Sequence, residues 1–275
     1  MNEQIREALR CPICGAAFEL ENNGKSLVCL GEKKRHCYDF SSSGYINFAP
    51  PAQSHSGDSK EAVRARTSFL NGGFYAPVCD AVKQAVRQHA RGLVIDAGCG
   101  EGYYSSAIAE AAEAVVGFDL SKFGVETAAK RVRGRDNAFF GVAGIYSMPL
   151  ASGSADGVVS IFAPCANEEF ERVLKENGVL IVACAGKDHL LGLKQAIYDT
   201  TYENTEREDM PLDMTLVSEQ RIAYEIKLED NKAITDLFYM TPYYYRTGER
   251  DMEKLRGLGR LTTPVDILVR VYRKK

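Results

Sequence analysis

Short apolar runs alternate with amphipathic stretches of helical spacing through the middle of the chain. The runs that predict strands are residues 93–95, 114–119, 137–143, 156–163, 178–185 and 265–272. The stretches that predict helices are residues 61–71, 78–88 and 104–112, with Ser121 as the N-cap of a further helix. The strand runs are apolar at consecutive positions, which is typical of strands buried on both faces. Strands and helices that alternate in this way predict an α/β fold with a doubly wound, mainly parallel sheet.

Three glycines at alternate positions follow the first of these strands. Asp96 ends the strand, and Gly98, Gly100 and Gly102 come directly before the helix. Glycine lets the backbone turn sharply and approach a ligand closely. A strand, a glycine turn and a helix N-terminus predict a nucleotide-type binding site. The spacing D-x-G-x-G-x-G differs from the G-x-G-x-x-G of dinucleotide sites. It resembles the first motif of the S-adenosylmethionine-dependent methyltransferases.

A second acid follows the next strand. Asp119 lies 23 residues after Asp96, where a doubly wound fold places the carboxylate that accepts hydrogen bonds from ribose hydroxyls. The alternative is a chance aspartate in a β–α loop. Because both halves of the motif are present, we predict that the chain binds S-adenosylmethionine through this turn and this acid.

Composition narrows the class of protein. The 275 residues are 45% hydrophobic, enough for one large domain and a small one, and the formal net charge is −3. This balance does not indicate a general nucleic-acid binder, so any RNA site must be a local basic patch. No apolar run is long enough for a membrane span, and no signal segment is present, which favours the cytoplasm. Eight cysteines in that setting predict reduced thiols rather than disulfides.

Half of the cysteines lie in residues 1–50, which we expect to form a separate small module. They are Cys11, Cys14, Cys29 and Cys37. A segment this short can hardly bury a sufficient core alone, so we expect a cross-link such as a bound metal to stabilise it. The C-x-x-C spacing of Cys11 and Cys14 suits two thiolate ligands of one tetrahedral zinc ion. The second half of the site would be Cys29 with either His36 or Cys37. The alternatives are thiols without metal and a redox C-x-x-C, but no thioredoxin-like βαβ pattern surrounds it.

The segments around the module complete the domain plan. Residues 38–40 and 44–48 are aromatic and predict two short strands about a serine turn. Their rings suit packing of the module, or stacking on unpaired bases. The next stretch is rich in proline, serine and glycine, so residues 51–65 are predicted to be a linker. Residues 66–275 then form the methyltransferase domain.

Basic residues gather at three places that could contact phosphates. They are Lys33, Lys34, Arg35 and His36 in the module, Lys60, Arg64 and Arg66 after the linker, and the run of residues 130–135. Such clusters are commonly solvated faces, and the last could simply favour the end of a helix. We expect the module and linker to hold the phosphates of an RNA hairpin.

Longer strings identify a closer resemblance. The chain resembles the bacterial 23S ribosomal RNA guanine-N1-methyltransferases, which combine an N-terminal zinc module with a Rossmann-like class I methyltransferase domain. The matching strings are residues 11–14 (CPIC), 44–47 (GYIN), 57–59 (GDS) with the helix around 65–66, 69–75, 96–104, 161–165 (IFAPC) and 240–242 (MTP). They span nearly the whole chain. The stretch after the fourth strand, residues 163–165, lies where this fold places residues that face the substrate.

The resemblance implies specific site residues and partners. It maps the zinc ligands onto Cys11, Cys14, Cys29 and His36, although the loop before His36 is longer here and Cys37 remains the alternative. It adds to the glycine turn a set of cofactor contacts at Tyr75, Gly102, Tyr103, Tyr104, Ser105 and His189. It also implies a 23S rRNA hairpin as substrate and a homodimer whose zinc modules build one RNA groove.

The implied reaction is methyl transfer to N1 of guanine. N1 carries a proton and becomes nucleophilic only when it is lost, so a base or hydrogen bonds at that edge should help. Asp156 and Cys165 are the candidates, with Cys165 as a pocket-lining thiol rather than a covalent nucleophile. Since N1 faces its pairing partner in a duplex, the target base must be unpaired or flipped out.

Two other functions compete with this one. A small-molecule methyltransferase would have a similar core, but the zinc module and basic linker favour a large substrate. An RNA-binding homologue without activity is the other alternative. The intact Asp96, Gly98, Gly100 and Asp119 argue against it.

Overall fold

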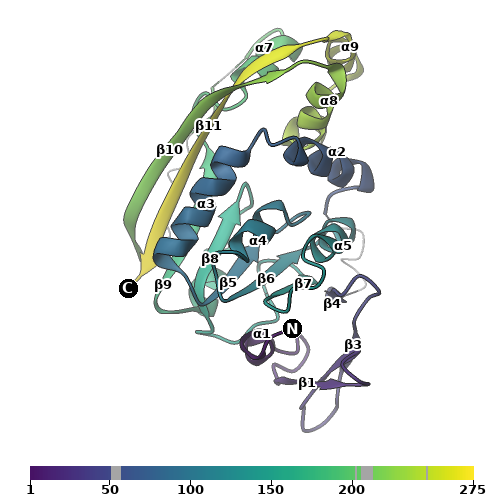
Figure 1. The fold of residues 1–275 in the computed structure, drawn as a ribbon, viewed down its shortest axis with the longest axis vertical. Coiled ribbons are helices and arrows are strands. Elements are labelled where there is room, and N and C mark those ends of the chain that lie inside the picture. Colours follow the sequence, from purple (N-terminus) through teal and green to yellow (C-terminus); the bar gives the residue numbers. More distant parts are fainter. Residues whose placement is uncertain (51–56, 202, 206–212, 246) are drawn as a thin grey trace.

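A single twisted sheet organises the computed structural model, which describes residues 1–50, 57–201, 203–205, 213–245 and 247–275 (Figure 1). In this part of the chain the sheet has eight strands in the order β10-β11-β9-β8-β5-β6-β7-β4. Their bounds are β4 Ile46–Asn47, β5 Leu93–Ala97, β6 Ala114–Asp119, β7 Ala138–Val142, β8 Ala155–Ile161, β9 Leu174–Ala185, β10 Met214–Leu228 and β11 Leu261–Lys274. The strands from β4 to β9 pair in parallel, and β11 runs antiparallel to β9 and β10. The predicted class I methyltransferase architecture is confirmed.

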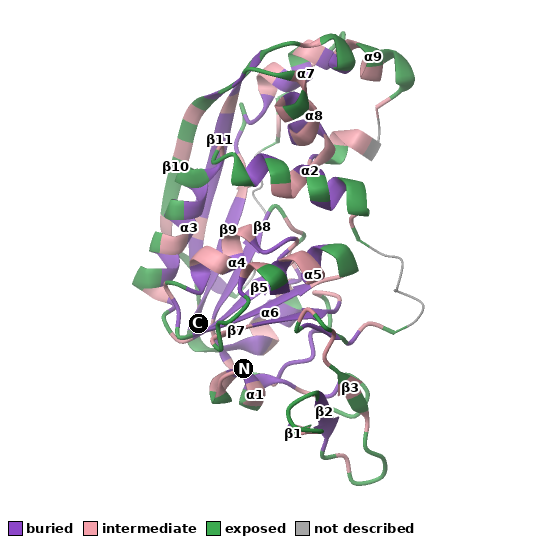
Figure 2. Ribbon diagram, turned by 45° about the vertical axis from the view of Figure 1, so that its right-hand side comes forward, coloured by how far each residue is buried: buried purple, intermediate pink, exposed green. Residues whose placement is uncertain are grey.

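Some of the helices cover the two faces of the sheet, and others lie beyond the carboxyl ends of its parallel strands (Figure 1). The helices are α2 Lys60–Asn71, α3 Ala76–His89, α4 Tyr103–Ile108, α5 Lys122–Arg131, α6 Asn167–Val173, α7 Leu191–Ile197, α8 Asn231–Tyr239 and α9 Glu249–Gly257. Val94 of β5 packs into the core beneath α3, whereas Leu93 and Ile95 pack into the core on the other face. This alternation explains why the strand is apolar at consecutive positions, and Figure 2 shows the central strands buried. None of the described helices has the length and apolar character needed to cross a bilayer.

Most element boundaries follow the sequence pattern, with a few departures. Strand β6 has the predicted bounds, and α2 begins one residue early at Lys60, where Ser59 accepts a hydrogen bond from the backbone of Ala62. Helix α4 ends at Ile108, earlier than expected. Strand β10 was not predicted because it is an edge strand whose side chains are largely exposed and polar, so it carries no apolar period.

The N-terminal segment forms its own small sheet. Helix α1 (Glu3–Ala8) is followed by an antiparallel sheet of β1 (Phe18–Glu21), β2 (Ser26–Cys29) and β3 (Cys37–Asp39). The segment then joins the large sheet, because β4 pairs in parallel with β7 and places Ile46 opposite Gly141. The expected strands at residues 38–40 and 44–48 correspond to β3 and β4.

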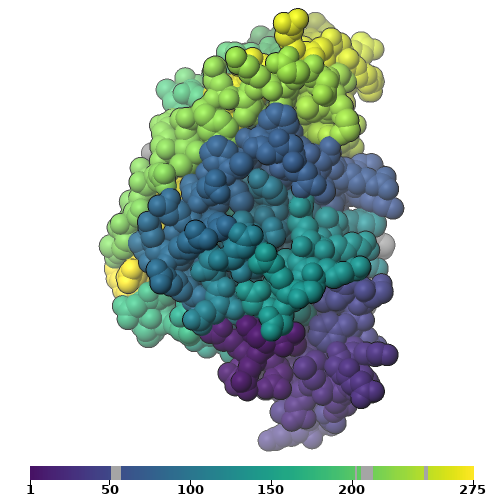
Figure 3. Space-filling model, viewed as in Figure 1, coloured from purple at the N-terminus to yellow at the C-terminus, as the bar shows by residue number. Residues whose placement is uncertain are grey.

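The N-terminal segment and the methyltransferase domain share one hydrophobic core. The Phe48 ring lies 6.4 Å from that of Phe118 and 6.3 Å from that of Phe139. On the same side Leu9 forms a β-bridge with Leu150. Figure 3 shows the purple N-terminal residues directly against the teal middle part of the chain. Of the predicted linker, residues 51–56 lie outside the described residues, and α2 occupies its last part.

Candidate active site and metal centre

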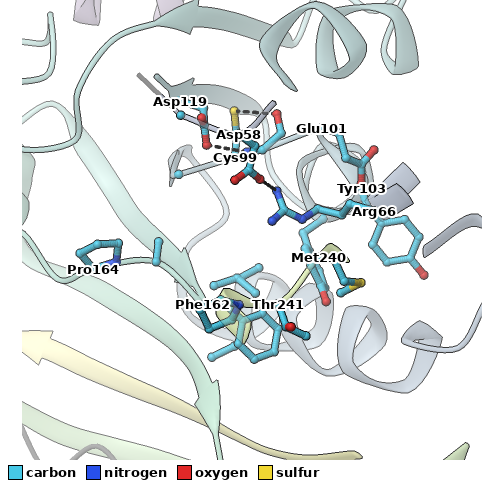
Figure 4. Close-up of a pocket in the computed structure, with 18 of the residues that line it drawn as sticks. Asp58, Arg66, Cys99, Glu101, Tyr103, Asp119, Phe162, Pro164, Met240 and Thr241 are labelled. Carbon is cyan, nitrogen blue, oxygen red and sulfur yellow. Dashed lines mark hydrogen bonds and ion pairs between the residues drawn. The ribbon is translucent and has the colours of Figure 1, made fainter. Parts of the chain in front are cut away.

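A cavity of about 860 Å³ opens at the carboxyl ends of the parallel strands (Figure 4). Its walls come from the turn after β5, the loops after β6, β7 and β8, the start of α2 and the segment that follows α8. The predicted cofactor residues that line it are Tyr75, Asp96, Gly98, Gly100, Tyr103, Tyr104, Asp119 and His189. Gly102 is the N-cap of α4 and Ser105 lies in its first turn, and neither is among the residues that line the cavity. Ligands of open α/β sheets bind at this edge.

The three glycines of the turn have different roles. All have positive φ angles, of 85° at Gly98, 51° at Gly100 and 80° at Gly102. A Cβ atom on Gly102 would lie 2.6 Å from the Cβ of Ala128, so this glycine lets α5 pack against the turn. A Cβ on Gly100 would meet only the Arg66 side chain, at 3.5 Å. Gly100 therefore leaves room for a ligand above the turn.

Asp96 is buried beneath the turn, and a hydrogen bond from α4 fixes its side chain. Ser105 Oγ donates a 2.5 Å hydrogen bond to its carboxylate. Burial raises the pKa of Asp96 to about 7, against the lowering effect of that hydrogen bond, and the nearby Asp119 adds to the rise. Ser105 thus supports the cofactor loop indirectly, by fixing the acid that ends β5.

Asp119 ties the second strand to the glycine turn. Its carboxylate accepts hydrogen bonds from the backbone N–H of Gly100 at 3.0 Å and of Ser121 at 2.7 Å. Burial raises the pKa of Asp119, and these two backbone hydrogen bonds act in the opposite direction. The side chain lines the cavity, as a ribose acceptor must.

The start of α2 closes the cavity above Asp119. Arg66 forms an ion pair with Asp58, and both side chains line the cavity (Figure 4). The hydroxyl of Ser121 donates to the backbone carbonyl of Asp58 at 2.8 Å, which anchors this segment to the β6 loop. Sequence reasoning placed Arg66 among phosphate contacts. The structure places it in the cavity wall, paired with Asp58.

Tyr75 and His189 form a buried pair at the far end of the cavity. Nδ1 of His189 accepts a hydrogen bond from the backbone N–H of Asp266 at 3.3 Å. The ring proton therefore lies on Nε2, which is 3.3 Å from the Tyr75 hydroxyl and donates to it. Burial lowers the pKa of His189 to about 4, so the imidazole is neutral. The Tyr75 hydroxyl proton remains available to donate to a ligand.

Two buried polar atoms of cavity-lining residues indicate that the cavity holds a polar ligand. The hydroxyl of Tyr104 and Oε1 of Glu101 are buried and have no hydrogen-bond partner in the described part of the chain. Both residues line the cavity. Glu101 also pairs with Arg131 at 2.5 Å. Unpaired buried polar atoms are costly, so a polar ligand in the cavity would compensate for them. The turn, the acid and these atoms fit a nucleoside cofactor with an amino-acid end.

The two candidate catalytic residues do not face the cavity. Asp156 lies near the amino end of β8, at the opposite edge of the sheet, where it accepts the backbone N–H of Leu93 at 2.8 Å and pairs with Lys175 at 2.9 Å. Asp156 thus links the starts of β5 and β8, outside the residues that line the cavity. Cys165 follows Pro164, which lines the cavity. Its own side chain packs against the hydrophobic core on the sheet face that carries Leu93 and Ile95.

Four side chains of the N-terminal segment converge as a Cys3His cluster. The ligand atoms of Cys11, Cys14, Cys29 and His36 all lie within 4.8 Å of one another. Nδ1 of His36 is 3.5 Å from the Cys11 sulfur and 3.4 Å from the Cys29 sulfur, and the Cys14 and Cys29 sulfurs are 3.6 Å apart. Thiolates around tetrahedral zinc lie about 3.8 Å apart, since Zn–S bonds are about 2.3 Å long. The cluster fits that geometry.

The backbone around the cluster favours the ligand form of its thiols. Burial alone would raise the pKa of Cys29, but hydrogen bonds from the backbone N–H groups of His36 and Gly31 lower it to about 6. A Cβ on Gly31 would lie 3.2 Å from the Cys14 sulfur, so only glycine fits easily in this loop. Cys37 is exposed, with its sulfur 3.7 Å from Asp39 Oδ1, and lies outside the cluster. Of the two alternatives for the fourth position, the structure brings His36 to the cluster.

The predicted basic clusters differ in how far they are neutralised within the chain. In the run of residues 130–135, Lys130 pairs with Glu126 at 2.6 Å and Arg135 with Glu110 at 3.5 Å. In the zinc module, Arg35 pairs with Glu21, whereas Lys33 and Lys34 are exposed. Lys33 and Lys34 thus present positive charge at the surface of the module, as Lys60, Arg64 and Arg133 do elsewhere.

The cavity wall formed by Met240, Thr241 and Tyr243 was not among the predicted site residues, and neither was Phe162. The strings 161–165 and 240–242 did stand out as matches to a family. Their place in the wall could not be derived, because the second lies about 80 residues after the first and its neighbours carry no regular apolar pattern.

Comparisons with known proteins agree with this site. A family model described as a methyltransferase domain matches residues 88–235. YxjB of Bacillus subtilis (strain 168), provisionally named a 23S rRNA (guanine-N(1)-)-methyltransferase, is 31% identical over 278 residues, covering 94% of this chain and 95% of YxjB. The 23S rRNA (guanine(748)-N(1))-methyltransferase of Streptomyces fradiae is 30% identical over 204 residues, covering 72% of this chain and 70% of that enzyme.

Proposed function

The chain belongs to the 23S rRNA (guanine-N1)-methyltransferase family, and from this membership we propose that it transfers a methyl group from S-adenosylmethionine to N1 of a guanine in a hairpin loop of 23S rRNA. The observation that carries the proposal is the similarity to YxjB over 94% of the chain, which extends well beyond the matched methyltransferase domain of residues 88–235. A methyltransferase acting on small molecules would share only the domain.

The cavity offers a place for each part of the cofactor. We assign the ribose hydroxyls to Asp119 and the close backbone approach to Gly98 and Gly100. The amino-acid end would lie toward Tyr75 and His189, where the Tyr75 hydroxyl can donate to a carboxylate. When bound, S-adenosylmethionine supplies a methyl group on a positively charged sulfur, so the protein's task is to position and desolvate the two reactants.

The substrate guanine must leave any base pair before it reaches this cavity. N1 and O6 lie on the pairing edge of guanine, so an unpaired or flipped base in a hairpin loop is required. Phe162 and Met240 line the cavity on the side away from Asp119 (Figure 4). This leaves separate positions for the base and for the adenosine end of the cofactor.

We assign a structural zinc ion to the cluster of Cys11, Cys14, Cys29 and His36. Its four ligands join the first loop to β2 and to the loop after it, and so would hold Lys33 and Lys34 in a fixed orientation. These lysines are the proposed phosphate contacts. A homodimer would place two such modules beside one hairpin, and a ribosomal substrate places the protein in the cytoplasm.

Methylation assays on defined substrates test the proposal directly. The purified protein should transfer methyl groups to a 23S rRNA transcript and to none of a panel of small-molecule metabolites. Primer extension should then stop at a single guanine, because N1-methylguanine blocks pairing. In rRNA from a strain that lacks the gene this stop should vanish, and complementation should restore it. Transfer to a metabolite but not to the transcript would refute the proposal.

A further inference from the structure

Phe162 has an unusual backbone conformation at the mouth of the cavity. It follows β8 directly and has a φ angle of 52°. A left-handed conformation is unfavourable for a residue with a side chain, because Cβ approaches the following carbonyl oxygen too closely. Strain of this kind persists where the surrounding structure enforces it, and it is concentrated at binding and catalytic sites. The conformation directs the Phe162 ring to the cavity wall rather than into the core.

One side of the Phe162 ring is firmly supported. The ring is nearly parallel to that of His189, at an interplanar angle of 13° and a centroid distance of 5.8 Å. His189 is itself fixed, because the backbone N–H of Asp266 and the hydroxyl of Tyr75 hydrogen-bond to its two ring nitrogens. The Tyr75 ring lies 6.4 Å away on the same side. The Phe162 ring therefore cannot turn inward.

The rest of the ring is open to solvent. Phe162 is 45% exposed although it lines a cavity. Large apolar side chains of this chain are otherwise mostly buried, and Tyr146, on the loop after β7, is the other strongly exposed aromatic residue of the cavity wall. Met240 and Thr241 line the same opening (Figure 4). An aromatic face held rigidly at an opening is suited to a flat ligand.

We propose that the exposed face of Phe162 is the stacking platform for the guanine that is methylated. This inference rests on the proposed function, which requires an unpaired base in the cavity. Aromatic side chains stack on single-stranded bases with about 1–3 kcal/mol per base. The platform lies at the opposite end of the cavity from Asp119, so the base and the ribose of the cofactor do not compete for it. Phe162 positions the base and takes no part in proton transfer.

Three variants test the platform in the full-length protein. Phe162→Leu removes the aromatic face, Phe162→Tyr keeps it, and Phe123→Leu is a matched control, because Phe123 is 43% exposed but lies outside the cavity. For methyl transfer to the 23S rRNA transcript, we expect kcat/KM of Phe162→Leu to fall by about 5- to 150-fold, the equivalent of 1–3 kcal/mol. Phe162→Tyr and Phe123→Leu should stay near wild type, and calorimetric affinity for S-adenosylmethionine should be unchanged in all three.

A second measurement does not depend on the variants' activity. We would place 2-aminopurine, whose fluorescence is quenched by stacking, at the guanine that primer extension identifies. It should be quenched in the wild-type complex and bright in the Phe162→Leu complex. Equal brightness in both, or a loss of cofactor affinity as large as the loss of kcat/KM, would overturn the platform. Absence of methyl transfer by the wild-type protein would instead overturn the proposed function, and the platform with it.

Discussion

The backbone N–H of Asp266 points at Nδ1 of His189, 3.3 Å away, and therefore requires that nitrogen to be unprotonated. The Asp266 carboxylate is held in turn by Arg221 Nε at 2.7 Å and by the backbone N–H of Asp188 at 3.0 Å. A Cβ on Gly186 would lie 2.4 Å from that carboxylate. The loop that carries His189 is thus fastened to β11 in a form that only a neutral imidazole allows.

This arrangement predicts a loss of stability in acid. Burial lowers the pKa of His189 from 6.5 to about 4, so between these values the unfolded chain binds a proton that the folded chain does not. The stabilising contribution is present above pH 6.5 and is lost as pH falls toward 4. Between pH 7 and pH 5 it decreases by about 2 kcal/mol. Urea denaturation of wild type and His189→Asn at both pH values measures the difference.

The comparison with His189→Asn is needed because Asp96 acts in the opposite direction. Burial raises the pKa of Asp96 to about 7, so this group favours the folded state more as pH falls from 7 toward its usual value. Both proteins contain Asp96, and its effect cancels in the difference. An equal loss of stability in the two proteins would contradict the assignment of a neutral, buried His189.

Asp119→Ala should weaken S-adenosylmethionine binding by about 10- to 100-fold, since hydrogen bonds to a charged group contribute about 1.5–3 kcal/mol. The substitution removes the proposed ribose acceptor and also frees the N–H of Gly100. Isothermal calorimetry measures the affinity. Asp136→Ala, which removes an exposed carboxylate outside the cavity, is the matched control. Unchanged affinity in Asp119→Ala would rule out the ribose role.

The Cys3His cluster predicts that His36 binds the metal and that its neighbour Cys37 does not. His36→Ala should lose the zinc ion and lower the midpoint of thermal unfolding, whereas Cys37→Ser should retain about one zinc per chain. Elemental analysis by mass spectrometry after dialysis provides the measurement. Retained zinc in His36→Ala together with loss in Cys37→Ser would reverse the assignment.

The exposed lysines of the zinc module predict that RNA binding weakens as the salt concentration rises. Replacing Lys33 and Lys34 with alanine should weaken binding of a hairpin transcript and reduce the slope of log K against log salt by about 1.4–1.8, if each lysine contacts one phosphate. Lys130→Ala is the matched control, because Lys130 is already paired with Glu126. Filter binding over a range of salt concentrations measures both. Identical slopes in the double variant and the wild type would argue against the contact.

The sequence predicted the parts of the structure that depend on local signals. The turn from Asp96 to Gly102 and the strand ending at Asp119 each have a local sequence signal. Backbone positions with positive φ favour glycine, and buried strands require apolar runs. The C-x-x-C of Cys11 and Cys14 is equally local. These features could be identified without knowing how the chain packs.

Long-range packing decided the rest. Nothing near Asp156 in the sequence indicated that its carboxylate would accept a hydrogen bond from the backbone N–H of Leu93, 63 residues earlier. Nothing near Arg66 in the sequence indicated that it would line the cavity, paired with Asp58. Strand β10 forms because β11 lies beside it, and its own exposed side chains gave no signal.

Packing of the N-terminal segment yields the last prediction, which concerns cooperativity. Phe48 is buried between Phe18 of the small sheet and Phe118 and Phe139 of the large sheet, at ring distances of 6.1, 6.4 and 6.3 Å. Phe48→Ala should therefore lower the free energy of unfolding by about 3–5 kcal/mol, the usual cost of such a core truncation.

Because the ring joins the two parts, the loss should appear in one transition rather than two. Scanning calorimetry of the zinc-loaded protein should show a single peak for the wild type and a single, lower peak for Phe48→Ala. Leu20→Ala, at an exposed position of β1, should leave the peak almost unchanged. Two separate peaks in the wild type would mean that the zinc module unfolds alone. The shared core would then contribute little to holding the module, and its lysines, in place beside the cavity.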